Sequence, residues 1–178
     1  MNYMQKEMIY IRILEETDIP TTTKWMNDVE ISDIMGYLPT FNLYQQLEWF
    51  RRIGSDNTRY IFAICNSADN EHIGNVGLGN IDYISRHCMF NIFIYNLKDR
   101  HRGIGVEATE LALEFAFNKL NMNKVYLRTS EKFAGAIRLY EKLGFIKEGV
   151  MRQHYYSNGE YQDKIMYSML KSEFYERK

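Results

Sequence analysis

The chain has 178 residues, a formal net charge of −1, 46% hydrophobic residues and 25% charged residues. These proportions are ordinary for a globular protein and exclude the fibrous and strongly charged disordered classes. No apolar stretch approaches the roughly 20 residues needed to cross a membrane, and the near-neutral charge argues against nucleic acid as a main partner. Because this length suits a single hydrophobic core, we predict one domain over residues 1–178, with a core from about 8 to 171.

The two cysteines give an indication of the cellular compartment. Cys65 and Cys88 are far apart and match neither a metal-binding nor a redox spacing. We interpret them as reduced thiols and expect no metal site. The first eight residues lack the apolar run of a signal peptide, so we expect a cytoplasmic protein.

The first half of the chain combines short β-like runs with amphipathic helical segments. Asp18 is a candidate helix N-cap, with Pro20 tolerated in the first turn, and Asn42 is a candidate N-cap of a second helix. The expected elements are strands at 8–14, 60–65 and 73–81, a helix at 18–27 and a helix from 42 onward. Glycines 74, 77 and 79 weaken the third of these strands and predict a bulge or a close neighbour there.

The second half contains two strand–helix units followed by a hairpin. Gly144 is a candidate left-handed helix end, and Asn158-Gly159 is a strong two-residue hairpin signal. The expected elements are strands at 87–95, 125–129, 150–156 and 161–170, and helices at about 104–120 and 136–143. This order indicates a mixed α/β fold with a mostly antiparallel twisted sheet.

The most informative motif lies between the 87–95 strand and the helix that follows it. Residues 100–105 read Arg-His-Arg-Gly-Ile-Gly. Glycines at the start of a helix allow a close approach to backbone N–H groups that have no partner within the helix. The sequence therefore predicts a phosphate or pyrophosphate site at this helix N-terminus.

Two common nucleotide motifs are excluded at this point. A Rossmann fingerprint requires a glycine where Ala108 stands, and an acidic residue at the end of the next strand, which instead ends in Thr129-Ser130. A Walker motif requires Gly-Lys-Ser/Thr after the loop, and this is missing. Both absences count against a nucleotide-binding oxidoreductase.

A second block, residues 136–145, reads Ala-Ile-Arg-Leu-Tyr-Glu-Lys-Leu-Gly-Phe. Together with the 100–105 motif and the short strand between them, this block resembles the GNAT N-acetyltransferases. Residues 25–28, 48–50 and 74–76 and the terminal hairpin extend the resemblance over nearly the whole chain. They are similar to the branch that contains ribosomal-protein, polyamine and amino-sugar acetyltransferases.

The resemblance implies a fold, a cosubstrate and site residues. The expected sheet is split by a cofactor cleft and flanked by about four helices, and the expected cosubstrate is acetyl-CoA. Backbone N–H groups of the loop would hold its pyrophosphate, a backbone N–H near Phe93 or Ile94 would polarise the thioester carbonyl, and Tyr140 would protonate the departing thiolate. The implied cofactor-binding residues are Phe93, Ile94, Arg100, His101, Arg102, Gly103, Ile104, Gly105 and Val106.

Two positions depart from the family pattern. Met89 stands where many relatives carry a glutamate that serves as base, and a thioether cannot take a proton from an ammonium ion. Asp82, His87 or Glu30 could act instead, and the sequence does not choose among them. Phe133 stands where the family often has an asparagine that contacts the cofactor.

These features predict an acetyl-CoA-dependent N-acetyltransferase in which a primary amine attacks the thioester directly. The expected acceptor is a small molecule, either a polyamine or an amino sugar, and a homodimer is plausible through the terminal hairpin. The alternatives are a protein N-terminal acetyltransferase and a non-catalytic acyl-CoA-binding module. For Tyr140, the competing interpretation is a core aromatic on an amphipathic helix.

Overall fold

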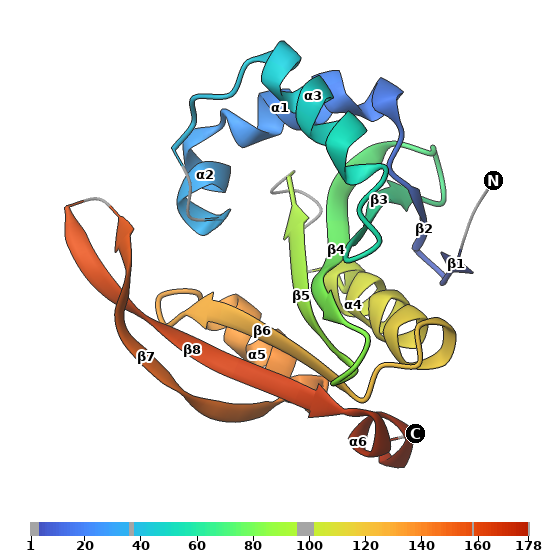
Figure 1. Cartoon of the computed structure of the whole chain (residues 1–178), viewed down its shortest axis with the longest axis vertical. Coiled ribbons are helices and arrows are strands. Elements are labelled where there is room, and N and C mark those ends of the chain that lie inside the picture. Colours follow the sequence, from blue (N-terminus) through green and yellow to red (C-terminus); the bar gives the residue numbers. More distant parts are fainter. Residues whose placement is uncertain (1–3, 36–37, 96–101, 158, 178) are drawn as a thin grey trace.

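One eight-stranded sheet runs through the molecule in the order β1-β2-β3-β4-β5-β6-β8-β7 (Figure 1). The computed structural model describes residues 4–35, 38–95, 102–157 and 159–177. Neighbouring strands are antiparallel except β5 and β6, which are parallel. The strands are β1 (Met4–Gln5), β2 (Ile9–Ile13), β3 (Tyr60–Asn66), β4 (His72–Asp82), β5 (His87–Ile94), β6 (Lys124–Ser130), β7 (Ile146–Ser157) and β8 (Glu160–Leu170).

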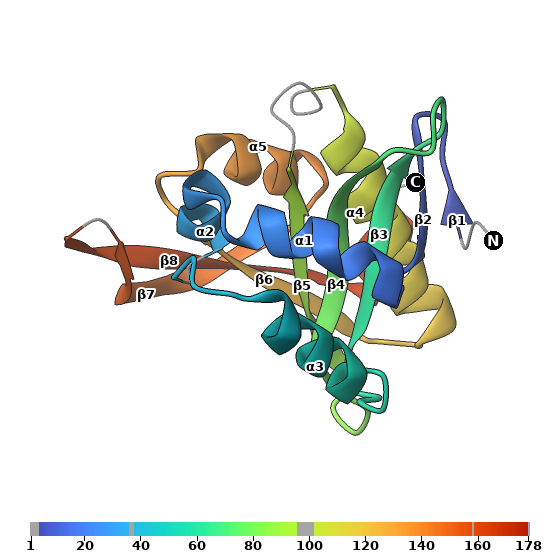
Figure 2. The same cartoon turned by 90° about the horizontal axis from the view of Figure 1, so that it is seen from above.

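Helices cover both faces of this sheet, with α1 and α3 on one side and α4 and α5 on the other (Figure 2). The described residues form six α-helices, compared with the expected four or so, because the short α2 and α6 are present in addition. They are α1 (Ile19–Met26), α2 (Val29–Met35), α3 (Leu43–Ile53), α4 (Ile104–Glu114), α5 (Ala134–Lys142) and α6 (Lys171–Glu176), with a 3-10 turn η1 (Glu16–Asp18) and a π-helical turn η3 (Phe115–Lys119). Within the described ranges, no helix is both long and apolar enough to span a membrane.

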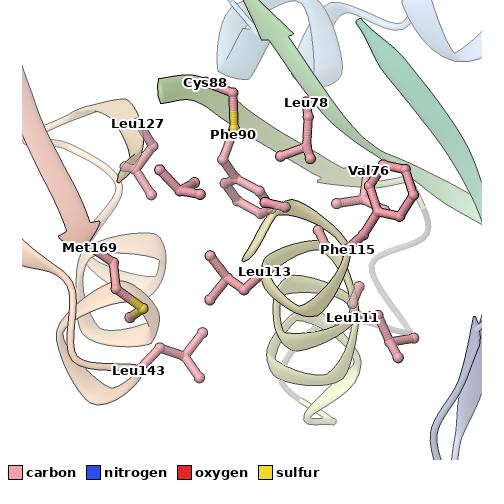
Figure 3. Packing of buried hydrophobic residues seen from close by; sticks show 14 of the residues in the cluster. Val76, Leu78, Cys88, Phe90, Leu111, Leu113, Phe115, Leu127, Leu143 and Met169 are labelled. Carbon is pink, nitrogen blue, oxygen red and sulfur yellow. The ribbon is translucent and has the colours of Figure 1, made fainter. Parts of the chain in front are cut away.

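The larger hydrophobic core lies between the sheet and α4 (Figure 3). Strand residues that alternate toward this face, such as Val76, Leu78 and Phe90, meet Leu111 and Phe115 from the α4–η3 segment. The period of 2 in the strands and the period of 3.6 in the helix produce two matching apolar surfaces. This packing fixes the N-terminus of α4 relative to the end of β5.

Several local predictions are confirmed. Asn42 caps α3, because its side chain accepts the N–H of Gln45 at 2.9 Å. Gly144 has φ +87° and follows α5, and the 150–170 segment forms the β7–β8 hairpin. The glycine-rich β4 contains the expected irregularity, since its register with β5 shifts between Gly79 and Asp82.

The predicted capping role of Asp18 is wrong. Its side chain accepts two hydrogen bonds from the guanidinium of Arg12, at 2.7 and 2.8 Å, and one from the N–H of Glu15. The Asp18 side chain is only 8% exposed. Burial opposes its ionisation, but the hydrogen bonds from Arg12 and Glu15 outweigh this effect and lower the pKa of Asp18.

We expect Asp18→Asn to lower the free energy of unfolding at pH 7 by about 3 kcal/mol, because it leaves the partly buried guanidinium of Arg12 without a countercharge. A lowered carboxyl pKa stabilises the fold above the unfolded value of about 3.9, and this contribution is lost as pH falls through the folded value. Urea unfolding at pH 7 and pH 3 checks this prediction. The difference in the free energy of unfolding between Asp18→Asn and wild type should be smaller at pH 3. Glu48→Gln, which breaks an exposed pair with Arg51, should cost less than about 1 kcal/mol; equal losses for the two variants would contradict the assignment.

Candidate active site

The helix α4 begins at a turn that has the geometry of an anion site. Gly103, just before the helix, has φ +90°, and its carbonyl oxygen accepts the N–H groups of Val106 at 2.9 Å and Glu107 at 3.1 Å. Among the described residues, the N–H groups of Ile104 and Gly105 have no hydrogen-bond acceptor. These amides, together with the positive end of the helix dipole, can bind a phosphate.

Beside this turn the sheet opens. Strands β5 and β6 pair at only three positions, and the last pair is Met89 with Tyr126. Beyond it, β5 runs on to Ile94 paired with β4 alone, while β6 runs on to Ser130 paired with β8 (Figure 1). The backbone of β5 that faces the gap can therefore pair with an extended ligand, as in β-augmentation.

A pocket of about 700 Å³ occupies the space between the end of β5 and the N-terminal ends of α4 and α5. Of the predicted cofactor-binding residues, Phe93, Ile94, Gly103, Gly105 and Val106 line it, as does the predicted acid Tyr140. The structure thus brings together two sequence blocks that are some 35 residues apart. Arg102 and Ile104 do not line the pocket, and the side chain of Ile104 is buried in the core. Arg100 and His101 lie outside the described residues.

Tyr140 lies on α5 with its ring between Phe90, Phe145 and Tyr167, at centroid distances of 6.3, 5.7 and 6.5 Å. It is 8% exposed, and its hydroxyl has no hydrogen-bond partner among the described residues. Burial raises its pKa to about 12. The phenol therefore stays protonated at neutral pH, and its hydroxyl group is available to a ligand in the pocket.

The pocket wall contains cationic residues that sequence reasoning missed. Lys132, Arg138 and Lys142 all line it from the segment that enters and forms α5. Their signal was present in the sequence, since the 136–145 block carries two of these charges. Phe133 also lines the pocket and occupies the N-cap position of α5 without a side-chain cap hydrogen bond.

The three candidate bases lie at different places. Glu30 belongs to α2, next to Ile31, which lines the pocket. His87 begins β5 and lies on the same side of that strand as Met89, with its Nε2 atom 3.8 Å from Oδ2 of Asp82. Asp82 accepts the N–H groups of Ser85 and Ile84, which lower its pKa and make it a weak base. None of the three lines the pocket.

These features together define an enzyme that transfers an acyl group from a coenzyme A thioester: a helix N-terminus for a diphosphate, a gap between parallel strands for an extended arm, and a buried phenol at its inner end. The chain belongs to the GNAT family of acetyltransferases, because residues 9–146 match the acetyltransferase (GNAT) domain. The predicted family, mixed α/β fold and acetyl-CoA-dependent acyl transfer are confirmed.

Similar proteins agree with this assignment. The chain is 30% identical to a spermidine N(1)-acetyltransferase of Vibrio cholerae over 94% of this chain and 95% of that protein. A crystal structure of the Vibrio cholerae enzyme in complex with CoA and spermine matches with a TM-score of 0.91 and 28% identity, covering 96% of this chain and 99% of that one. A dodecameric structure of that enzyme matches with a TM-score of 0.86 and 28% identity, over 97% and 99% of the two chains.

Proposed function

We propose that this protein transfers the acetyl group of acetyl-CoA to a primary amine of a small molecule. The observation that carries the proposal is that one pocket joins the N-terminus of α4, the open end of β5 and the hydroxyl-bearing face of Tyr140. The amine attacks the thioester carbonyl within a ternary complex and forms a tetrahedral intermediate. The carbon–sulfur bond then breaks, the nitrogen gives up one proton as the amide forms, and the thiolate takes up one proton and leaves as the free thiol.

The proposed roles follow from position. The free backbone N–H groups at the start of α4, within residues 102–106, hold the diphosphate of the cosubstrate, and Arg100, which matches the first basic position of the family motif, adds a charge-assisted contact. The free backbone groups at the end of β5 pair with the pantetheine arm, and a backbone N–H near Phe93 or Ile94 polarises the thioester carbonyl. Tyr140 donates its proton to the departing thiolate. The cations Lys132, Arg138 and Lys142 add charge along the same wall.

Two acceptor classes fit a small-molecule enzyme. The similarity to spermidine acetyltransferases supports a polyamine. An amino sugar is the second class. A protein N-terminus is the remaining alternative acceptor.

Release of free CoA thiol from acetyl-CoA, measured against a panel of primary amines, tests the proposal. We expect at least one small amine to raise the rate well above acetyl-CoA hydrolysis without acceptor, with a kcat in the usual enzyme range of about 1–1,000 s⁻¹. Saturable acetyl-CoA binding with no acceptor-dependent release across the panel would contradict it and favour the binding module.

We further propose that copies of this chain associate. The dodecameric structure of the similar Vibrio cholerae enzyme supports this. The β7–β8 hairpin projects from the body of the molecule (Figures 1 and 2) and exposes Val150, Tyr156 and Tyr161. We expect this hairpin at a contact between copies, with a homodimer as the simplest assembly. The two buried free cysteines support a reducing compartment such as the cytoplasm.

A further inference from the structure

Two cations, Arg128 on β6 and Lys164 on β8, share the sheet face opposite the face that contacts α5. Phe90 faces Tyr140, so its neighbour Met89 points to the other face. The Nη2 atom of Arg128 donates to the sulfur of Met89 at 3.4 Å, which places Arg128 on that face. Lys164 follows by register, since Arg128 pairs with Met166, two residues from Lys164. The two cations are therefore diagonal neighbours on adjacent strands.

Neither cation forms an ion pair with a carboxylate in the described part of the chain. Arg128 contacts the Met89 sulfur and Nε2 of His154, each at 3.4 Å. The Nζ atom of Lys164 lies 4.3 Å from the centre of the Tyr155 ring. Burial and the charge of Arg128 lower the pKa of Lys164, so the protein holds two like charges together at an energetic cost.

Lys124 lies on the same strand and the same face, four residues from Arg128, but it has a carboxylate partner. Its ammonium pairs with Glu148 at 2.5 Å, and the same carboxylate accepts the hydroxyl of Ser168. A carboxylate partner is thus supplied at one end of this face and not at the other. Within the described part of the chain, Arg128 and Lys164 therefore lack the carboxylate partner that Lys124 has on the same face.

A β-bulge in β7 brings His154 into this cluster. The register of β7 with β8 shifts between Met151 and Tyr155, and Gln153 has φ +49°. The N–H of Gln153 donates to Oδ1 of Asp163 at 2.8 Å, so that carboxylate is engaged by the bulge and pairs with neither cation. Bulges beside functional sites re-aim a side chain, here the imidazole that contacts Arg128.

The cluster lies where the acceptor must approach. Met89 and Tyr126 form the last pair before β5 and β6 separate, and Arg128 lies two residues further along β6, on the rim of the opening. Most of the residues that line the cofactor pocket come from the side of α4 and α5, while Phe93, whose ring contacts Trp25 of α1, lines it from the side of Arg128. An amine that attacks the thioester through the gap therefore arrives from the face that carries Arg128 and Lys164.

We propose that Arg128 and Lys164 bind a phosphate group of the acceptor, so that the substrate is a phosphorylated amine, such as an amino sugar phosphate. This inference rests on the proposed acetyl transfer and selects the amino-sugar class over the polyamine class. A guanidinium fork and an ammonium are the side chains best suited to phosphate oxygens. Two uncompensated cations would instead repel the ammonium groups of a polyamine.

Matched acceptors test the proposal. Values of kcat/KM should be at least about 10-fold higher for glucosamine 6-phosphate than for glucosamine, and higher for O-phosphoethanolamine than for ethanolamine, with spermidine below the phosphorylated amines. A comparison of kcat/KM for 4-aminobutyrate and butylamine tests whether a carboxylate on the acceptor can replace the phosphate. Arg128→Gln and Lys164→Gln should each lower kcat/KM for glucosamine 6-phosphate by about 10- to 100-fold and leave the acetyl-CoA KM and the glucosamine rate nearly unchanged. Lys124→Gln is the matched control and should behave as wild type.

A preference for spermidine or for the unphosphorylated amines, unchanged in Arg128→Gln, would overturn the inference while the acetyltransferase function stands. Titration calorimetry measures the affinity of the CoA-saturated protein for glucosamine 6-phosphate, so this test does not depend on turnover. Binding that is weakened in Arg128→Gln supports the phosphate site even if no amine is acetylated, a result that would overturn the proposed function alone. No binding to wild type, or equal binding to the variant, would overturn the phosphate site.

Discussion

Replacing Tyr140 with phenylalanine should lower kcat by about 100- to 10,000-fold, the usual contribution of a general acid, while leaving the Kd for acetyl-CoA nearly unchanged. The change removes one hydroxyl that has no hydrogen-bond partner among the described residues, so the fold loses little. The thiolate would then leave without a proton donor. Steady-state kinetics and calorimetry with acetyl-CoA measure the two quantities separately.

The pH dependence of the wild-type enzyme provides a second readout. An acid must be protonated to act, and burial raises the pKa of Tyr140 to about 12. Activity that depends on this proton is therefore kept as pH rises through 10, the ordinary tyrosine value, and is lost only near 12. A fall in kcat centred near pH 10 that Tyr140→Phe abolishes would contradict this account of the site.

Tyr167→Phe is the matched control for this prediction. Tyr167 is also buried, its ring lies 6.5 Å from that of Tyr140, and its hydroxyl donates to Glu141 at 2.8 Å. It does not line the pocket. We expect this variant to keep its kcat, so that equal losses in both variants would indicate a packing effect and not acid catalysis.

Gly103→Val should weaken acetyl-CoA binding by at least about 10-fold. Gly103 has φ +90°, where a side chain costs about 1–2 kcal/mol and a β-branched one more. A Cβ atom there would also lie 3.0 Å from the terminal methyl of Met8. The turn must shift to relieve the backbone strain and the close contact with Met8, and the amides of Ile104 and Gly105 shift with it. Titration calorimetry with acetyl-CoA measures the loss.

Gly149→Val is the control for the glycine substitution. A Cβ atom at Gly149 meets no atom within 4 Å, and the residue lies in β7, where valine is favourable. Its affinity for acetyl-CoA should match wild type. Gly105→Val should also weaken binding, because its Cβ would lie 2.9 Å from Leu139 and fill the pocket wall. A folded Gly103→Val protein with unchanged affinity would contradict the role of this turn.

Much of the fold could be predicted from the sequence because its periodic elements are long. The strand at 87–95, the helix from 104 and the terminal hairpin all appear within a few residues of their expected positions. The missed elements are short: β1 has two residues, and α2 and α6 have seven and six. Segments of this length carry too little pattern to separate them from loops. Glu30, a candidate base, lies within α2, one of these missed elements.

The candidate site was only partly predictable. Residues contributed by one motif, such as Gly103, Gly105 and Tyr140, could be located because each motif is local. The cluster of Arg128 and Lys164 could not, because three strands and a bulge bring it together, and strand register is a property of the whole sheet. Asp18 shows the opposite error, since its local capping signal was overridden by the side chain of Arg12.

The central claim is that the amides at the start of α4 bind the diphosphate of acetyl-CoA, with the thioester in the gap between β5 and β6. A crystal structure of the protein with acetyl-CoA tests it most directly. The account predicts diphosphate oxygens about 3 Å from backbone nitrogens within residues 103–106, and the thioester sulfur within hydrogen-bond reach of the Tyr140 hydroxyl. Acetyl-CoA bound elsewhere, with the Gly103 turn unoccupied, would contradict it.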